Sequence, residues 1–288
     1  MASPNSTSAP KRKPLPSLYS TVSATVSPLT LASWVKLSSS LDGRDKITKI
    51  IAYLSRLLAW YYKSVLLLPD AAAKFTALKN TVQMARKPFR MGKVVNEVHK
   101  IRNCLARPTL SEVERVGDET KESPQQANAL PLYRKVGMIG KMIGLAGFWC
   151  GDNVVFLTKG VNFLHHDDKD KRMTLGTRAH HFASRLYFFG AICHFLEGIE
   201  NVRRHWKALE KAQLENVEDS ELKKLQLKGF EMYVSLFKAC CDITVFSNNP
   251  GVDLWKKKRG KKLSEAIVSL AGLGSASTVI WKNYPKIS

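Results

Sequence analysis

The chain has 288 residues, and its 45 lysines and arginines exceed its 24 acidic residues, which gives a formal net charge of +21. This length is enough for one large domain or two small ones, and the charge predicts an anionic partner, either nucleic acid or a membrane surface. The five cysteines form no CxxC pair and no zinc-like spacing, so we expect reduced thiols in an intracellular compartment and no metal site.

The first predicted element is a tail. Residues 1–41 contain no Asp or Glu and are rich in Ser, Thr and Pro, a composition that predicts a disordered basic segment. Asp42 is the expected N-cap of the helix that follows. Between Ile47 and Leu68, apolar residues recur at spacings of three and four, which predicts an amphipathic helix that ends at Pro69.

The stretch Met84–Ala106 is the main candidate for a functional element within a predicted N-terminal amphipathic helical region of residues 42–107. Drawn as a helix, it sets an apolar stripe opposite a cationic face, which is the pattern of a helix lying in an anionic membrane surface. Because proline is tolerated only in a first turn, regular helix is expected to begin near Lys87. The alternative interpretation is a helix packed in a protein core with a solvated basic face.

The sequence then changes character twice. Residues 108–131 combine acidic residues with Ser, Pro and Gln, and so long a polar stretch predicts a linker before a C-terminal helical membrane region of residues 132–288. That region opens with an apolar segment whose glycines have GxxxG spacing, which lets two helices approach closely. The charges of Lys141 and Asp152 predict a half-inserted or bundled segment instead of a clean membrane span. The candidate helix-packing and oligomerisation residues are Gly140, Gly144, Gly147 and Gly151.

Three more helices are predicted downstream, over residues 174–213, 222–246 and 266–281. The last has no charge and is close to the length of a membrane span, and it follows the dense basic run of residues 255–262. The alternative is a helix of small residues packed in a core. The expected fold is therefore all-α, a membrane-associated helical bundle with amphipathic helices and one or more hydrophobic membrane segments.

Motifs of conventional catalysis are missing from the sequence. It contains no phosphate-binding loop, no GxSxG or HExxH motif and no dinucleotide fingerprint. The histidines and aspartates of residues 165–172 are contiguous, and contiguous side chains cannot all converge on one ion. We therefore expect no enzymatic activity and no cofactor.

Four segments occur in an order that resembles the peroxin-11 family, whose members are peroxisomal membrane proteins that drive elongation and proliferation of the organelle. They are GRDKITKIIAYLSRLLAWY (43–61), ARKPFRMGKVVNEVHKI (85–101), GFWCGDNVVFLTKG (147–160) and GLGSASTVIWKNY (272–284). The resemblance covers residues 42–284, and the first two segments are its most specific parts. It implies a protein of the peroxisomal membrane that remodels the membrane through an amphipathic helix and promotes peroxisome proliferation and fission.

The resemblance also implies a site and partners. The family's membrane-remodelling helix corresponds to Met84–Ala106, whose cations would bind headgroups and whose apolar residues would wedge between acyl chains. The implied partners are an anionic phospholipid membrane, other copies of the chain, a fission adaptor with a dynamin-related GTPase, and a chaperone for peroxisomal membrane proteins. The candidate lipid-binding residues are Arg86, Lys87, Arg90, Met91, Lys93, Val94, Val95, Val98, Lys100 and Ile101.

Two other functions remain open at this point. A channel or solute-passing protein of the same organelle would use polar residues within apolar segments, namely Lys141, Asp152 and Arg185, to line an aqueous path. A basic helical nucleic-acid binder would show steeply salt-dependent binding without lipid. The apolar runs near residues 140–160 and 266–281 weigh against this second alternative, so we expect no nucleic-acid partner.

Overall fold

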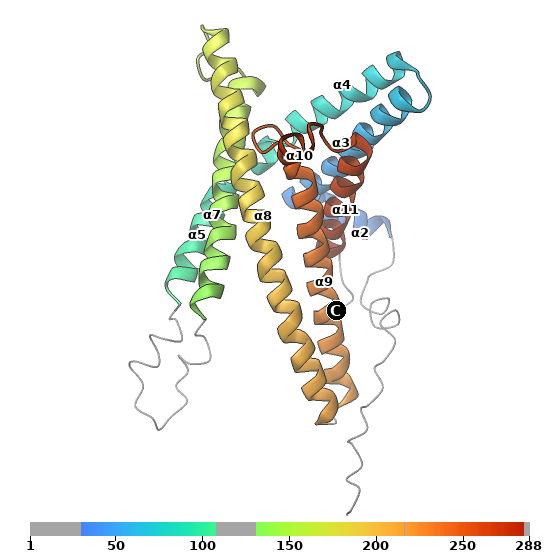
Figure 1. The fold of residues 1–288 in the computed structure, drawn as a ribbon, viewed down its shortest axis with the longest axis vertical. Coiled ribbons are helices and arrows are strands. Elements are labelled where there is room, and N and C mark those ends of the chain that lie inside the picture. The colour runs from blue at the N-terminus through green and yellow to red at the C-terminus, as the bar shows by residue number, and fades with distance from the viewer. Residues whose placement is uncertain (1–29, 108–130, 216, 285–288) are drawn as a thin grey trace, which may run out of the picture.

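The computed structural model describes residues 30–107, 131–215 and 217–284 of the chain. Every regular element in these ranges is a helix (Figure 1), so the predicted all-α fold is confirmed. None of the described helices is both long enough and apolar enough to span a bilayer, and the predicted hydrophobic membrane segments are therefore not found there. Most of the predicted tail and of the acidic linker lies outside the described residues.

Three helices make up the N-terminal part: α2 (Leu31–Ser39), α3 (Leu41–Ser64) and α4 (Pro69–Ala85). The first of them occupies the end of the predicted tail. The N-cap of α3 is Ser40, whose hydroxyl oxygen accepts a hydrogen bond of 2.9 Å from the backbone N–H of Gly43. Asp42 thus lies in the first turn and not at the predicted cap, where its negative charge still favours the helix N-terminus. Figure 1 shows α4 folding back along α3.

The middle of the chain forms two long helices that pack against each other, with a shorter helix packed on the first of them. A short 3-10 turn (Pro88–Arg90) and α5 (Lys93–Leu105) precede α7 (Leu132–Val155), which continues into a π-helical turn. The longest helix is α8 (Lys169–Leu214) with 46 residues. In Figure 1, α5 packs along α7 and α7 packs along the first part of α8, so these helices form one arm of the molecule.

The C-terminal helices join this arm to the N-terminal part. They are α9 (Asp219–Ser247), α10 (Leu254–Arg259) and α11 (Glu265–Asn283), and α9 packs on both α8 and α11. Because α11 also packs against α3, it connects the two halves of the chain (Figure 1). The buried core at this junction consists of Tyr53, Val245 and Val268.

The glycines with GxxxG spacing lie where α7 meets α8. A Cβ atom built on Gly144 would be 2.6 Å from the Cα of Gly190, and one built on Gly151 would be 2.7 Å from the Cβ of Ala183. Only glycine leaves room for such an approach of the two backbones. This glycine face is therefore occupied by α8 of the same chain, and its role in self-association stays a prediction.

The contact between α7 and α8 predicts a difference between two glycine-to-alanine variants on one helix. Gly144→Ala should lower the free energy of unfolding by about 1–3 kcal/mol, because the added methyl group overpacks the interface. Gly137→Ala is the matched control, since a Cβ built there meets nothing within 4 Å. This control should raise stability by about 0.5–1 kcal/mol through helix propensity. Urea denaturation followed by circular dichroism measures both, and equal effects would contradict the close contact.

Candidate functional site

The stretch Met84–Ala106 is not one continuous helix. The α4 helix ends at Ala85, the 3-10 turn Pro88–Arg90 follows, and α5 begins only at Lys93. Gly92, directly before α5, has a φ of 79°, a left-handed conformation that interrupts the helix. Regular helix therefore begins later than the predicted position near Lys87. The segment between α4 and α5 directs the side chains of Arg86 and Arg90 into the protein.

A buried carboxylate on α3 receives two of these side chains. Asp45 is 0% exposed, and its Oδ1 lies 3.1 Å from Nη2 of Arg86 and 3.3 Å from Nε of Arg90. Its Oδ2 lies 2.6 Å from Nζ of Lys46. Burial alone would raise the pKa of Asp45, but the cations outweigh this effect and hold the pKa well below its usual value. The carboxylate is therefore charged at any physiological pH.

A second carboxylate, Asp152 on α7, binds the same turn from the other side. Its Oδ2 lies 2.9 Å from Nη1 of Arg90, and its Oδ1 pairs with Lys87, whose pKa is lowered by burial. Arg90 thus bridges α3 and α7, and its guanidinium also stands 5.7 Å from the centre of the Trp149 ring. We call this set of ion pairs the Asp45–Asp152 cluster, formed by Asp45, Asp152, Lys46, Arg86, Lys87 and Arg90.

In this segment two of the cationic side chains point into the protein and part of the apolar stripe points outward. A helix that lies on lipid headgroups would instead present its cations to the headgroups. Arg86 and Arg90 are buried, whereas Met91 just before α5 is 50% exposed, and Val95 and Val98 on the outer side of α5 are 69% and 55% exposed. The remaining predicted apolar residues, Val94 and Ile101, are half-buried. The structure thus brings part of the apolar stripe to the surface. The lipid-binding role of the whole set stays a prediction.

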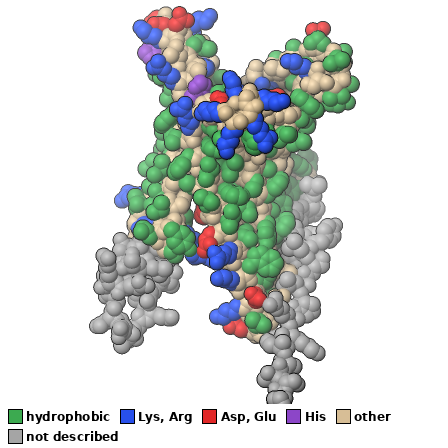
Figure 2. Space-filling model, viewed as in Figure 1, with side chains coloured by type: hydrophobic (Ala, Val, Ile, Leu, Met, Phe, Trp, Pro, Cys, Tyr) green, Lys and Arg blue, Asp and Glu red, His purple; other side chains and the backbone are tan. Residues whose placement is uncertain are grey.

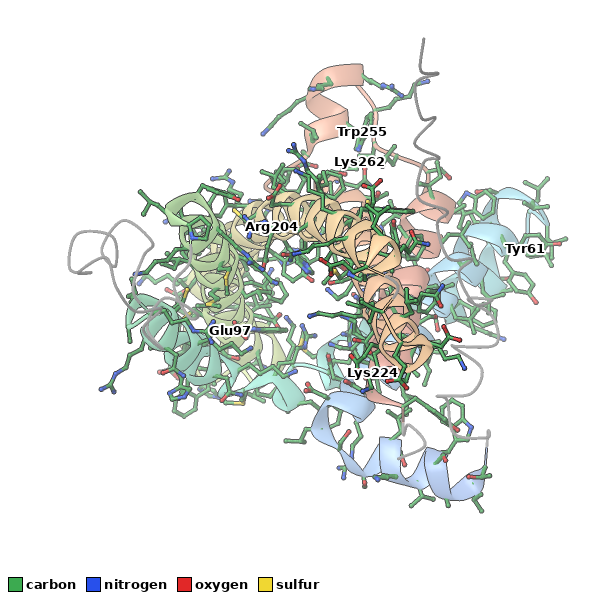
Figure 3. All side chains as sticks on the ribbon, turned by 90° about the horizontal axis from the view of Figure 1, so that it is seen from below. Tyr61, Glu97, Arg204, Lys224, Trp255 and Lys262 are labelled. Carbon is green, nitrogen blue, oxygen red and sulfur yellow. The ribbon has the colours of Figure 1, made fainter. Side chains whose placement is uncertain are left out.

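Two predicted lipid-binding cations remain near the surface. Lys93 pairs with Asp42 and stands 5.4 Å from the centre of the Trp149 ring, with 21% of its side chain exposed. The side chain of Lys100 is 55% exposed and lies 2.7 Å from a carboxylate oxygen of Glu97. Figure 3, seen from below, places Glu97 on the arm formed by α5 and α7, well away from Tyr61 on α3.

A further buried acid was not found by sequence reasoning. Asp242 on α9 is 3% exposed, and one of its carboxylate oxygens accepts hydrogen bonds from Lys238 at 2.6 Å and from the Tyr187 hydroxyl at 3.0 Å. The other oxygen accepts from the hydroxyl of Ser275 at 2.5 Å and lies 3.7 Å from Nζ of Lys49. The sequence feature that could have indicated this buried acid is its position as the single charged residue within the largely apolar run of residues 239–246. This group ties α9 to α3, α8 and α11.

The polar residues that a channel would use are engaged within the chain. Nζ of Lys141 lies 3.1 Å from a carboxylate oxygen of Glu197, and Nε of Arg185 donates a hydrogen bond of 2.8 Å to the backbone oxygen of Gly251. Asp152 belongs to the Asp45–Asp152 cluster. All three charged residues within the apolar segments therefore have partners inside the protein, and contacts within the fold explain their presence without an aqueous path.

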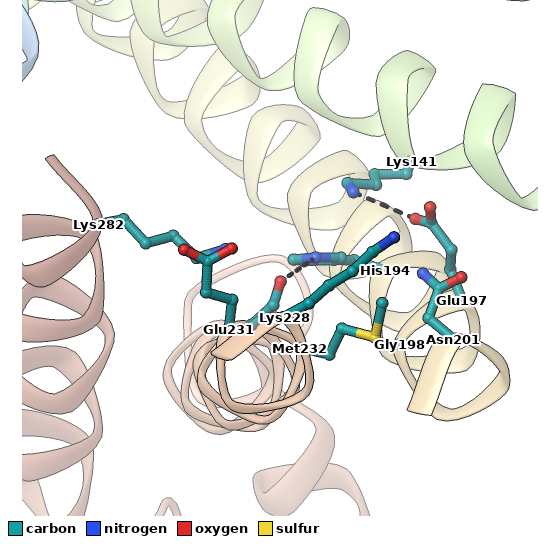
Figure 4. Close-up of a pocket in the computed structure, with 10 residues that line it drawn as sticks. Lys141, His194, Glu197, Gly198, Asn201, Lys228, Glu231, Met232 and Lys282 are labelled. Carbon is teal, nitrogen blue, oxygen red and sulfur yellow. Dashed lines mark hydrogen bonds and ion pairs between the residues drawn. The ribbon is translucent and has the colours of Figure 1, made fainter. Parts of the chain in front are cut away.

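An open pocket of about 280 Å³ lies between α7, α8 and α9 (Figure 4). His194 lines it, with Nε2 at 3.2 Å from the hydroxyl oxygen of Ser235. Burial, supported by the charges of Lys141 and Lys238, lowers the pKa of His194 to about 3. The imidazole is therefore neutral at physiological pH.

The fold and this site define an all-α bundle whose buried charges hold helices together and whose apolar α5 face is open. Within the described residues, no group of three or more His, Cys, Asp and Glu side chains is arranged to hold a metal ion. Such a molecule belongs to the class of all-α helical bundles.

A family model for peroxisomal biogenesis factor 11 (PEX11) matches residues 31–120 and 118–284. The chain therefore belongs to the PEX11 family, and the resemblance seen in the sequence is confirmed. Membership gives the chain a role in peroxisome biogenesis and proliferation and an association with peroxisomes. It also confirms that the chain is not an enzyme. No curated protein and no solved structure matched the chain in similar comparisons.

The Asp45–Asp152 cluster predicts a strong dependence of stability on one carboxylate. Asp45→Asn should lower the free energy of unfolding by about 3–5 kcal/mol, because it leaves buried cations without their counter-charge. Asp42→Asn is the control, since the side chain of Asp42 is 60% exposed and its ion pair is worth at most about 1 kcal/mol. Chemical denaturation at neutral pH compares the two variants. Similar small losses in both would show that the cluster adds little to stability.

The pocket predicts how stability depends on pH. The pKa of His194 is about 3 in the folded chain, so as pH falls below the ordinary histidine value of about 6.5 the unfolded chain binds the proton first. The free energy of unfolding should therefore decrease as the pH is lowered below about 6.5. The variant His194→Gln should reduce the slope of the free energy of unfolding against pH by up to about 1.4 kcal/mol per pH unit. Denaturation between about pH 6.5 and 4.5 covers the range in which the unfolded chain binds this proton, and the difference between the two profiles removes the contribution of carboxylates, which titrate in both chains. A profile for His194→Gln that is identical to the wild-type profile would refute the assignment.

Proposed function

We propose that this chain is a peroxisomal membrane protein that remodels the membrane by shallow insertion of α5 and thereby promotes peroxisome proliferation and fission. One observation carries the proposal, namely the outward apolar stripe of α5. Its exposed members on the helix are Val95, Val98 and Leu105, at spacings of three and seven, and the exposed Met91 lies just before the first turn. A stripe of this kind without a protein partner suits a helix that lies in a lipid interface.

The free energy available from this stripe is sufficient for membrane contact. Full burial of one such side chain contributes about 1.5–3 kcal/mol, so four side chains that are half to two-thirds exposed offer roughly 3–6 kcal/mol. Insertion into one leaflet expands the area of that leaflet and so favours curvature. In this arrangement the apolar side chains enter the lipid directly, while Lys100 at the edge of α5 is available to headgroups.

Headgroup binding by Arg86, Lys87 and Arg90 is a further part of the proposal and needs a second conformation. These cations are engaged by Asp45 and Asp152, so the Asp45–Asp152 cluster has to open before they reach phosphates. The proposal also includes self-association, a fission adaptor with a dynamin-related GTPase, and the chaperone for peroxisomal membrane proteins. These partners rest on family resemblance alone.

Vesicle tubulation by the full-length chain tests the proposal. Val95→Asp with Val98→Asp should abolish tubulation of anionic vesicles in electron micrographs, because a charge on the stripe opposes insertion. The matched control is Leu31→Asp with Val35→Asp on α2, where the side chains are 81% and 58% exposed. Both double variants should keep their stability to within about 0.5 kcal/mol per substitution, since all four sites are on the surface.

Two results would count against the proposal. A wild-type chain that neither binds nor deforms vesicles would remove the membrane-remodelling function. Unchanged tubulation by the variant with Val95→Asp and Val98→Asp would leave that function intact but assign insertion to another element.

A further inference from the structure

The most strongly charged surface of the molecule belongs to α10 and the residues that follow it. Between residues 256 and 262 every residue except Gly260 is a cation, and all seven residues are exposed. Figure 2 shows this basic cluster as blue side chains that stand out between the upper end of the arm formed by α7 and α8 and the helix pair α3 and α4. In Figure 3, Trp255 and Lys262 lie on an element that projects away from the bundle. We call residues 256–262 the α10 knob.

The charges of the α10 knob are mostly uncompensated. Lys262 lies 3.1 Å from a carboxylate oxygen of Asp253, and Arg259 stacks over the ring of Trp255 at 4.8 Å. Within the described parts of the chain, Lys256, Lys257 and Lys258 form no ion pair, in contrast to the buried cations at the turn before α5. The knob therefore presents free ammonium groups to the solvent.

The body of the protein fixes the position of the α10 knob. The indole N–H of Trp255 donates a hydrogen bond of 3.0 Å to the hydroxyl of Ser247, and the backbone N–H of Leu263 donates one of 2.8 Å to the side-chain oxygen of Asn248. Before α10 in the chain, Gly251 packs closely on α8, because a Cβ atom added to Gly251 would be 2.8 Å from the Cα of His181. Because these contacts hold both ends of the knob, its cations are presented together on one side of the bundle.

Exposed apolar side chains run along α8 from this position. On α8, the residue next to His181 is Phe182, which is 56% exposed, and Phe189 and Leu196 continue the stripe at 48% and 60% exposure. A cationic knob beside exposed aromatic and aliphatic side chains complements an anionic bilayer surface, where headgroups and acyl chains meet. A phosphate backbone of nucleic acid would match the lysines but would leave this apolar stripe in water.

We propose that the α10 knob, through Lys256, Lys257 and Lys258, is the site at which this chain binds anionic phospholipid headgroups. This inference deepens the proposed function and rests on it. It provides a first contact with headgroups before the Asp45–Asp152 cluster opens, because Arg86, Lys87 and Arg90 are paired there whereas the cations of the knob are exposed. Binding through the knob requires no opening of the bundle, and it places the α8 stripe against the membrane.

The test is vesicle flotation of the full-length chain. One set of vesicles contains phosphatidylcholine alone and the other contains equal parts of phosphatidylcholine and phosphatidylserine. The triple variant Lys256→Gln, Lys257→Gln and Lys258→Gln should lower the ratio of anionic to neutral partition by about 100-fold, given roughly 1 kcal/mol for each cation. Folding should be unaffected, because these side chains are exposed.

A matched triple variant controls for net charge. Arg203→Gln, Lys207→Gln and Lys223→Gln remove three exposed cations at the other end of α8 and α9 and should leave the partition ratio near its wild-type value. An equal loss in both variants would overturn the site in favour of a general charge effect.

The remaining outcomes separate the inference from the proposed function. A wild-type chain that binds both kinds of vesicle equally would overturn the knob as a headgroup site and leave membrane binding standing. A wild-type chain that binds neither would overturn both. If the knob variant lost binding to duplex DNA while its vesicle ratio stayed unchanged, the knob would be assigned to nucleic acid and the proposal would fail.

Discussion

The arrangement of the molecule depends on the burial of one carboxylate among cations from a neighbouring turn. Asp45 has no access to water, and a charge in such a place costs several kcal/mol unless it is paired. Arg86 and Arg90 provide that pairing only when the chain turns sharply after α4 and directs them inward. The same turn presents Arg90 to Asp152, so one short segment joins α3 to α7. The open outer face of α5 follows from this geometry.

The apolar side chains and the free cations therefore lie on two separate surfaces, whereas the sequence alone predicts them on one helix. A lipid-binding helix is usually described with cations and apolar residues on opposite sides of a single cylinder. In this member of the PEX11 family, α5 exposes apolar side chains while its neighbouring cations stabilise the fold, and the free cations lie on the α10 knob. Insertion and charge recognition then depend on different elements, and each can be altered without the other.

Local patterns predicted the helices of this fold well, and the contacts between helices far less. The stripe that begins at Ile47 became helix as far as Ser64, four residues short of Leu68, and the uncharged run of residues 266–281 is helical throughout, because a periodic apolar face is a local property. The inward direction of Arg86 and the role of Asp45 depend on partners distant in the sequence, which no helical wheel contains. The glycines of α7 were recognised as a packing face, but their partner is α8 of the same chain.

The position of α11 against α3 has a consequence for the synthesis of the protein. Nζ of Lys49 donates a hydrogen bond of 2.8 Å to the hydroxyl of Ser275 across 226 residues, and the ring of Trp34 meets that of Tyr284 at 6.0 Å. The first helices therefore have no final partner until α11 has left the ribosome. At about 5–20 residues per second, this interval is roughly 10–45 s. During that time the side of α3 that α11 later covers is exposed, so the bundle closes only after α11 has been synthesised.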